Sequence, residues 1–267
     1  MKDIKKALKN GEVVIGTFNL IPHPTVVEII GYAGFDFLII DCEAGALSPW
    51  GTEMENMIRA AYAADVTPLV RVTQKNTSGM IHKALNSGAR GIVIPHVNTR
   101  EEIATAINAA KYPPEGNRTA DPICRAPKYG ATTWSDFVRT ANEEVMVIPL
   151  LEEKAAMDNM EDILSVNGLD MVLFGPFDLA LRLGGVGEPK AEAQVSEYEA
   201  KVISLCNERG IFVMSFGWDA DSVKRSISNG CRAIAYSADI SRLNQALWRD
   251  VEDLKNEIPG CLLSKGG

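Results

Sequence analysis

Short apolar runs alternate with longer amphipathic segments along nearly the whole chain. Four of these runs follow the same signal, a Gly that ends a helix and then one or two linking residues. These four span residues 33–41, 87–95, 167–175 and 229–237. Four further runs lie between them, at residues 13–19, 67–72, 145–151 and 211–215. The pattern therefore predicts eight strands.

Segments with helical spacing separate the predicted strands. Their apolar residues recur every three or four positions, which is typical of helices that bury one face. The predicted helices cover residues 24–33, 50–64, 77–87, 99–111, 153–165, 191–209, 219–229 and 239–256. The strands are apolar on both faces, as expected for parallel strands covered by helices. This alternation predicts an α/β fold, a (β/α)₈ TIM barrel, with a doubly wound open sheet as the alternative.

One segment interrupts the alternation. Residues 112–133, between the fourth and fifth predicted strands, are rich in Pro, Gly and polar residues. Connections of this length usually have a functional or interfacial role. The C-terminal residues 260–267 are expected to be frayed or to lie against a neighbouring subunit. No change of composition divides the chain, so residues 1–267 are predicted to form a single barrel domain.

Composition and charge exclude several classes of partner. The net charge is −8, the pI is near 5.1, and no run of Lys and Arg stands out, which argues against a nucleic-acid partner. No apolar run approaches the length of a membrane span, and the charged N-terminus does not resemble a signal sequence. The five scattered cysteines suit free thiols in a reducing compartment. These features predict a cytoplasmic protein that acts on small molecules, without a nucleic-acid or membrane partner.

Two acidic residues follow neighbouring predicted strands. Glu152 comes directly after the run 145–151, and Asp178 comes after the turn that closes the run 167–175. If these strands are parallel neighbours, both carboxylates emerge at the edge where α/β folds bind their ligands. Two carboxylates without a nearby His or Cys suit a hard divalent cation. The alternative is that Asp178 caps one helix and Glu152 begins another.

Arg71 is the third candidate, because it lies at the end of the buried run 67–72. A guanidinium there needs an anionic partner or a carbonyl oxygen to polarise. The alternative is a structural ion pair with Asp41 or Glu43. The turn at residues 175–178 adds backbone N–H groups that can bind a carboxylate. Together these groups favour a site for a 2-oxo acid, where Arg71 stabilises the enolate formed when the C3–C4 bond breaks.

Other predicted strands also bring polar residues to this edge. They are Asn19, His23, Asp41, Glu43, His96, Ser215 and Ser237. His96 and His23 are the candidate general bases, with an inert hydrogen-bonded role for His96 and a loop role for His23 as alternatives. Packing rather than chemistry is expected for Phe18, Cys42, Trp50, Trp134 and Phe216.

The sequence resembles the HpcH/HpaI aldolase family, the metal-dependent class II pyruvate aldolases of the phosphoenolpyruvate/pyruvate barrel superfamily. The resemblance covers nearly the whole chain and rests on the motifs GFDFLIIDCE, PLVRV, KYPPEGNR, LLEEKAAM and GPFDLALRLG, in this order. It implies that Glu152 and Asp178 bind a divalent metal, Mg²⁺, Mn²⁺ or Co²⁺. It also implies that Arg71 stabilises the enolate, and that the turn from Gly175 through Phe177 to Asp178 holds the pyruvate carboxylate.

The same resemblance implies further features of the site and of the assembly. Asp41 matches an acidic residue near the metal-bound water. Members of the family are commonly homohexamers, built as trimers of dimers. Their C-terminal helix is exchanged between subunits, and that helix corresponds to residues 239–256 here.

Three positions depart from the family pattern. The family usually reads Asp-x-Glu-His after the second strand, and Ala44 stands here in place of that histidine. The acid usually paired with the histidine appears as Asn86, so both members of a proton-transfer dyad are predicted to be lost together. Leu150 replaces a Gln two residues before Glu152, which makes the pocket more apolar.

Three functions follow from this combination. The leading prediction is a divalent-metal-dependent carbon–carbon lyase that cleaves a 4-hydroxy-2-oxo acid to pyruvate and an aldehyde through an enolate. The first alternative is decarboxylation of an oxaloacetate-type acid, because it forms the same enolate without a base and Ala44 removes the usual one. The second alternative is a non-catalytic 2-oxo acid binder.

Overall fold

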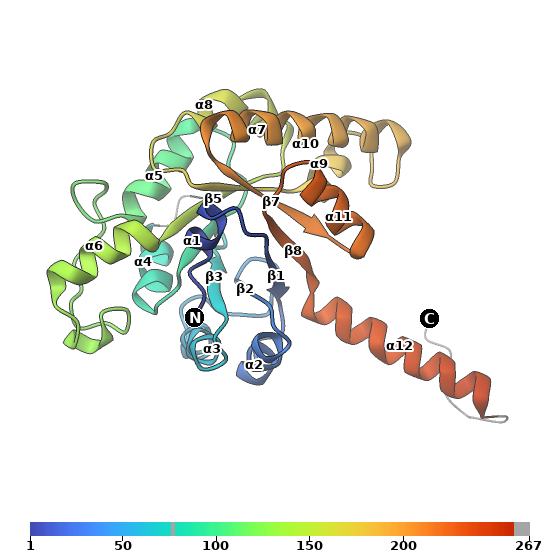
Figure 1. Cartoon of the computed structure of the whole chain (residues 1–267), viewed down its shortest axis with the longest axis horizontal. Helices are drawn as coiled ribbons and strands as arrows, with labels where there is room; N and C mark the ends of the chain where they lie inside the picture. The colour runs from blue at the N-terminus through green and yellow to red at the C-terminus, as the bar shows by residue number, and fades with distance from the viewer. Residues whose placement is uncertain (76–77, 259–267) are drawn as a thin grey trace.

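The computed structural model describes residues 1–75 and 78–258. Eight parallel strands in this part of the chain close into a barrel, each paired with the next and the last paired with the first (Figure 1). They are β1 (Val14–Asn19), β2 (Phe37–Asp41), β3 (Thr67–Arg71), β4 (Gly91–Ile94), β5 (Met146–Leu151), β6 (Met171–Phe174), β7 (Phe212–Gly217) and β8 (Ala233–Ala238). The closed barrel confirms the predicted fold and rules out the open sheet.

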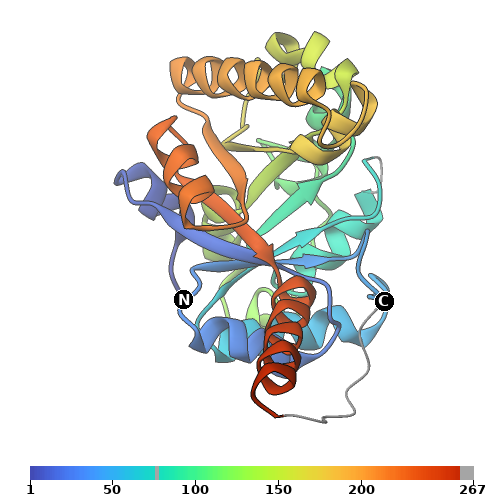
Figure 2. The ribbon, with the colours of Figure 1, turned by 90° about the vertical axis from the view of Figure 1, so that its right-hand side faces the viewer.

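Helices follow the strands and cover the outside of the barrel (Figure 2). In chain order they are α1 (Ile4–Lys9), α2 (Pro24–Tyr32), α3 (Thr52–Ala63), α4 (Ser78–Asn86), α5 (Arg100–Ala110), α6 (Trp134–Glu144), α7 (Lys154–Asp158), α8 (Met160–Leu164), α9 (Pro176–Arg182), α10 (Pro189–Arg209), α11 (Ala220–Ser228) and α12 (Asp239–Glu257), with a short 3₁₀ turn η1 (Lys128–Gly130). Helix α1 precedes the first strand and packs Ile4 and Leu8 against the inner cluster of the barrel.

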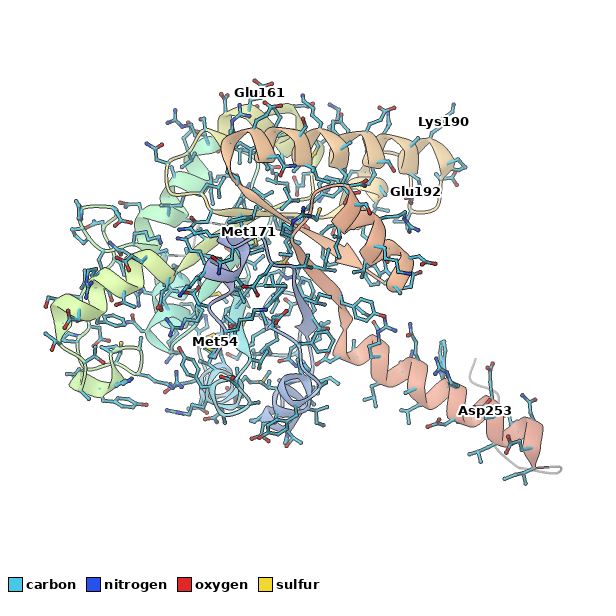
Figure 3. The ribbon with its side chains drawn as sticks, in the orientation of Figure 1. Met54, Glu161, Met171, Lys190, Glu192 and Asp253 are labelled. Atoms are coloured by element: carbon cyan, nitrogen blue, oxygen red, sulfur yellow. The ribbon has the colours of Figure 1, made fainter. Side chains whose placement is uncertain are left out.

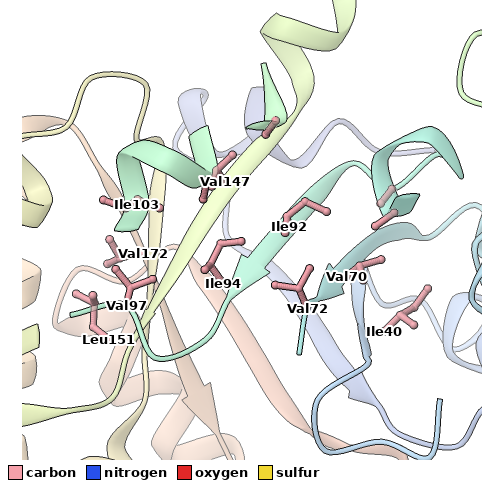
Figure 4. Packing of buried hydrophobic residues seen from close by; sticks show 14 of the residues in the cluster. Ile40, Val70, Val72, Ile92, Ile94, Val97, Ile103, Val147, Leu151 and Val172 are labelled. Atoms are coloured by element: carbon pink, nitrogen blue, oxygen red, sulfur yellow. The ribbon is translucent and has the colours of Figure 1, made fainter. Parts of the chain in front are cut away.

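Side chains alternate between the inside of the barrel and its outer surface along each strand. In β2, Phe37 and Ile39 belong to the inner cluster, whereas Leu38 and Ile40 belong to the outer cluster beneath the helices. Figure 4 shows members of the outer cluster on neighbouring strands and on the helices above them. Both faces of each strand are therefore buried, which explains why the strand runs in the sequence are almost continuously apolar.

Two helical regions differ from the prediction. Helix α6 lies directly after the insertion at residues 112–133 and was not expected, because only Ala141 and Asn142 of its residues are buried. Its first turn is anchored by aromatic contacts between Trp134, Phe137 and Tyr112. The helix predicted at residues 153–165 is divided into α7 and α8 at Asn159, which has a non-helical backbone and donates its side-chain N–H to the Asn98 carbonyl at 2.9 Å.

The last helix, α12, leaves the barrel and projects away from it (Figures 1 and 2). None of its residues is buried. Apolar residues nevertheless recur along one side, since Ile240, Leu243, Leu247 and Leu254 are all exposed at helical spacing. Charged residues such as Asp253 of α12 and Lys190 of α10 point away from the protein body (Figure 3). In the described part of the chain, no helix is both long enough and apolar enough to span a bilayer.

Candidate active site at the carboxyl ends of the strands

The two acids predicted as metal ligands follow β5 and β6, which are adjacent in the barrel. The Gly175 backbone N–H donates to the Leu151 carbonyl at 2.9 Å and so joins the two strand ends. A Cβ on Gly175 would lie 2.7 Å from Cβ of Glu152, so only glycine allows the Glu152 side chain to lie against this turn. Asp178 follows in the first turn of α9 and is exposed. The structure therefore brings both carboxylates to one edge of the barrel.

Glu152 has the environment expected of a cation ligand. Its side chain is 4% exposed, and burial raises its pKa to about 7, with further increases from the neighbouring charges of Asp178 and Glu43. The His96 backbone N–H, 2.9 Å away, and the His96 ring act in the opposite direction. Neighbouring carboxylates that raise the pKa of Glu152 create a demand for positive charge, which a divalent cation would meet. The residues present therefore fit such an ion.

The protein offers two possible ligands for a metal ion here, Glu152 and Asp178. Across residues 1–75 and 78–258, no group of at least three His, Cys, Asp or Glu side chains could hold a metal ion. Glu152 and Asp178 would leave most coordination positions to other oxygen donors, as Mg²⁺ sites with one or two carboxylates usually do. Such a site is open to a small substrate that carries its own oxygens.

Arg71 lies at the end of β3 and is held by two acids. Its Nε and Nη2 donate to the two carboxylate oxygens of Asp41 at 2.9 and 2.5 Å, and its Nη1 lies 2.9 Å from Glu43 Oε2. Burial acts to lower the pKa of Arg71, but these two carboxylates raise it above its ordinary value. The ion pairs weighed from the sequence are therefore both present, and the guanidinium is fixed in position.

Asp41 is held by the turn that follows β2. It is buried, and its Oδ1 accepts hydrogen bonds from the backbone N–H groups of Glu43 at 3.0 Å and Ala44 at 3.1 Å. The turn thereby orients the carboxylate that orients Arg71. Ala44 contributes only its backbone to this arrangement, so no imidazole extends from the turn.

His96 connects the acids of β2 and β5. Its backbone is in the left-handed region, with φ of 56°, which aims the backbone N–H at Glu152. The ring Nδ1 lies 3.1 Å from both Glu152 Oε1 and Glu153 Oε1, and Nε2 lies 3.0 Å from Glu43 Oε1. Both ring nitrogens therefore contact carboxylates, and a chain of polar contacts runs from Asp41 and Arg71 through Glu43 and His96 to Glu152.

Glu153 is a site residue that the sequence analysis missed. It contacts the His96 ring and also accepts from Asn98 Nδ2 at 2.9 Å and from Arg182 Nη2 at 3.2 Å. These contacts tie the start of α7 to the end of α9. Its position next to Glu152 is the only sequence signal for this role, because an acid that begins a helix is common.

Aromatic rings form a continuous row beside Arg71. The Phe18 and Phe216 rings stack at 5.4 Å, Phe216 stacks on Trp218 at 6.0 Å, and Trp218 meets Phe177 edge-on at 5.1 Å. The Arg71 guanidinium lies 5.3 Å from the Phe18 ring centre. Packing was predicted for Phe18 and Phe216, and they do pack on each other. Trp218 and Phe177, exposed by 43% and 47%, end the row at the surface.

Some residues predicted at this edge have other roles. Ser215 Oγ donates to Glu199 of α10 at 2.8 Å, so it faces the helix layer and the prediction that it lines the edge is wrong. His23 caps α2, with its Nδ1 accepting from the Thr25 backbone at 3.2 Å. Asn19 donates to Asp239 at 2.6 Å. These contacts position loops rather than reactive groups.

Two further predictions concern Cys42 and Asn86. Burial, with a smaller contribution from Asp41, raises the pKa of the Cys42 thiol to about 12, which agrees with a packing role. Asn86 ends α4 and bonds Arg118 at 2.8 Å. Helices of this barrel run opposite to the strands, so Asn86 lies at the other end of the barrel from Ala44. The two positions therefore cannot form a pair within one chain.

A closed barrel of parallel strands, with acids and an arginine at their carboxyl ends, defines a (β/α)₈-barrel enzyme. Residues 15–246 match the model of the HpcH/HpaI aldolase/citrate lyase family, and the chain belongs to this family. It is accordingly a carbon–carbon lyase.

Relatives resemble the chain over most of its length. A hydroxypyruvate/pyruvate aldolase of Sagittula stellata is 31% identical over 245 residues, which cover 91% of this chain and 93% of the relative. A 2-dehydro-3,6-dideoxy-6-sulfogluconate aldolase of Pseudomonas putida is 29% identical over 236 residues, 88% of this chain and 90% of the relative. The crystal structure of an HpcH/HpaI aldolase from Desulfitobacterium hafniense has a TM-score of 0.87 at 32% identity, covering 96% of this chain and 98% of that one.

Proposed function

We propose that the protein is a divalent-metal-dependent aldolase that cleaves a 4-hydroxy-2-oxo acid to pyruvate and an aldehyde. The observation that carries this proposal is the location of Glu152 and Asp178 just beyond adjacent strand ends, with Glu152 connected to Arg71 through Glu43 and His96. The relatives also include an aldolase named for a 4-hydroxy-2-oxo acid, the 4-hydroxy-2-oxovalerate aldolase of Novosphingobium aromaticivorans, 30% identical over 246 residues.

Glu152 and Asp178 would hold the metal, and a bound Mg²⁺, Mn²⁺ or Co²⁺ would polarise the 2-oxo group of the substrate. Arg71 would donate its remaining N–H groups to the same oxygen as negative charge develops there. Because Asp41 and Glu43 already fix the guanidinium, its dipoles need little rearrangement during the reaction. The turn from Gly175 to Asp178, including Phe177, would receive the substrate carboxylate.

His96 is the residue best placed to move a proton in this site. Its Nε2 contacts Glu43 at 3.0 Å, and its ring is partly exposed at the edge of the barrel. Cleavage requires removal of the proton from the 4-hydroxyl group, and Ala44 cannot accept it. We therefore assign this step to His96 Nε2, which would release its contact with Glu43 to accept the proton, while Glu153 holds Nδ1 and Asp41 orients Arg71.

The test is exchange of the pyruvate methyl protons with deuterated water during a titration with Mg²⁺, Mn²⁺ or Co²⁺. We expect exchange to appear with metal and to disappear in Glu152→Gln. Glu161→Gln is the matched control, because Glu161 lies on the outer surface of α8 (Figure 3). Folded protein that binds pyruvate and metal but exchanges no protons would overturn the proposal and favour the non-catalytic binder.

Decarboxylation of oxaloacetate remains a second candidate, since Ala44 offers only a backbone N–H to the site. Loss of CO₂ needs no base to deprotonate a hydroxyl group, so the substitution would matter less to that reaction. Rates with oxaloacetate and with a series of 4-hydroxy-2-oxo acids separate the two. Aldol turnover far above decarboxylation would exclude this candidate.

Other observations support a proposal for the assembly and location. The exposed apolar stripe of α12 supports an oligomer in which this helix packs on another subunit, and the family resemblance implies a homohexamer, a trimer of dimers. Free thiols at Cys42, Cys124, Cys206 and Cys231 suit a reducing compartment such as the cytoplasm. We therefore propose a cytoplasmic oligomer.

A further inference from the structure

A groove of about 440 Å³ lies at the opposite end of the barrel from Glu152. It is bounded by the end of α4, the insertion at residues 112–133 and helix α6. Arg90 and Val145, which directly precede β4 and β5, lie at its base. Since the strands run from this end towards the candidate active site, the groove is separated from that site by the length of the barrel.

Positive charge gathers in the groove although the chain is acidic. The lining includes Arg90, Arg118, Arg125 and Lys128, but its one acidic residue is Asp136. Two tyrosines and a phenylalanine supply much of the remaining wall. The volume lies in the range of small-molecule sites, and apolar walls with a few convergent polar groups are typical of them.

Arg118 is the strongest sign of a ligand. Its side chain is 4% exposed, and no carboxylate within the described part of the chain forms an ion pair with it. It donates to Asn86 at 2.8 Å and lies 4.7 Å from the Tyr112 ring centre, while its buried Nε has no hydrogen-bond partner. Burial lowers the pKa of Arg118. The charge of Asp121 acts on Arg118 from a distance and in the direction that raises its pKa, but Asp121 forms no ion pair with it. A buried charge without a contacting counter-ion is unfavourable, so an anion from outside the chain would relieve this arrangement.

The neighbouring cations are also available to a ligand. Arg125 donates to the Ser87 carbonyl at 2.8 Å and lies over the Tyr62 ring at 4.5 Å, and among the described residues no acid pairs with it. Lys128 is exposed at the groove and makes no ion pair there. Arg90 pairs with Glu144, yet its buried Nε has no partner.

We propose that this groove is a second binding site, which takes a compact anion with two or more negative charges. Guanidinium groups match the planar, bidentate geometry of phosphate and carboxylate oxygens, so a phosphorylated metabolite or a polycarboxylate has the required chemistry. Net charge −8 disfavours general attraction of anions, so binding depends on the local arrangement of these four side chains. The proposal does not depend on the aldolase reaction.

The test uses the full-length protein in its native assembly, titrated by calorimetry with pyrophosphate and, in a second arm, with citrate. Acetate serves as the singly charged comparison. We expect one of the two polyanions to bind at least tenfold more tightly than acetate. Tighter binding of pyrophosphate indicates a phosphorylated ligand, and tighter binding of citrate indicates a polycarboxylate. Each of Arg125→Gln and Lys128→Gln should weaken binding by about tenfold, the loss of one charged hydrogen bond. Lys224→Gln, on the distant α11, is the matched control.

Both probes also bind metal ions, so the titrations are done without added metal and repeated with Glu152→Gln. Binding that survives this substitution and is not displaced by pyruvate supports the groove. Binding that is lost in Glu152→Gln, or that is unchanged in the two groove variants, would overturn the proposal. A native assembly that binds neither polyanion would also overturn it, because the groove would then be closed or filled by another copy. Proton exchange of pyruvate tests the aldolase assignment separately.

Discussion

Arg71 has a structural role in the ion pairs at the end of β3 and a chemical role in the proposed reaction. Asp41 and Glu43 accept three of its donor contacts, and a guanidinium carries five N–H groups. Two N–H groups therefore remain for a substrate oxygen. The ion pairs expected as an alternative to catalysis hold the side chain in one orientation, which the proposed catalytic role also requires, so the two interpretations do not exclude each other.

The first prediction concerns Arg71→Lys. An ammonium keeps the charge but loses the fork that Asp41 holds, so stabilisation of the developing enolate should fall more than substrate binding. We expect kcat to fall by about a hundredfold, similar to the loss of one oxyanion donor. Single-turnover rates and melting temperature should be measured together, with Arg59→Lys at an exposed position of α3 as the control. A destabilised but fully active Arg71→Lys protein would contradict the catalytic role.

Lys111 carries a second prediction at this scale. Its buried Nζ donates to the carbonyls of Asn142 and Val145 at 2.5 and 2.6 Å, and burial, followed by the charge of Lys5, lowers its pKa from 10.5 to about 8. Between pH 8 and 10.5 the unfolded chain therefore binds more protons than the folded one. The free energy of unfolding should rise with pH in this window, by at most about 1.4 kcal/mol per pH unit.

The measurement is denaturant unfolding from pH 7.5 to 10 for the natural protein and for Lys111→Met, which keeps an unbranched side chain but lacks the terminal ammonium group. Other groups titrate equally in both proteins, so the difference between the two curves reports Lys111. We expect the natural protein to gain stability relative to Lys111→Met as the pH rises. Parallel curves would show that the pKa of Lys111 is not lowered.

Among the elements, the turn between β6 and α9 decides the geometry of the acidic pair. Gly175 provides the space that the Glu152 side chain occupies, and Pro176 then begins α9 with Asp178 in its first turn. The Gly-Pro pair that marks this turn in the sequence is therefore also what places the two acids. Helix α6 shows the opposite situation, because Trp134 and Phe137 become an anchor only through contact with distant Tyr112.

Gly175→Ala should separate Glu152 from this turn. The added Cβ would lie 2.7 Å from Cβ of Glu152, so one of the two segments must shift. We expect the affinity for the metal to fall at least about tenfold, as for displaced supporting groups around metal ligands, with smaller effects on folding. Calorimetric titration with Mn²⁺ measures this. Gly79→Ala is the matched control, since its Cβ would meet only Trp50 at 3.6 Å. Equal metal affinity in both variants would refute the assignment of Glu152.

At the scale of the whole molecule, α12 is a helix whose apolar side is not buried within one chain. Its apolar stripe remains exposed beside a closed barrel, and such a surface usually marks an interface. Residues 260–267, expected from the sequence to be frayed or to lie against a neighbouring subunit, lie outside the described part of the chain. The expected exchange of this helix between subunits therefore rests on the stripe.

Leu247→Glu should disrupt the assembly. A charge in the centre of the stripe would be buried against the partner subunit, which is strongly unfavourable. We expect light scattering to show a smaller species than the natural protein forms. Gln245→Glu introduces the same charge on the opposite side of α12 and should leave the mass unchanged. An identical mass for Leu247→Glu would exclude α12 from the interface.

The sequence by itself determined the order of strands and helices and the barrel they form. Each strand has a continuous apolar run that must be buried on both faces, and a chain of such units closes in only a few ways. The same order fixes which residues follow a strand end. Glu152, Asp178 and Arg71 were therefore predictable as members of one edge.

Only the tertiary structure decided which side chains meet. His96 contacts three acids, and its backbone has a left-handed φ. No pattern in the sequence predicts this backbone conformation. Ser215 turns towards α10, and Asn86 lies far from Ala44, although their sequence positions suggested otherwise. Arg118, Arg125 and Lys128 are spaced along one insertion without forming a run of basic residues, and only the fold brings Arg90 to them. Local periodicity encodes burial, whereas the contacts of polar side chains depend on distant segments that folding brings together.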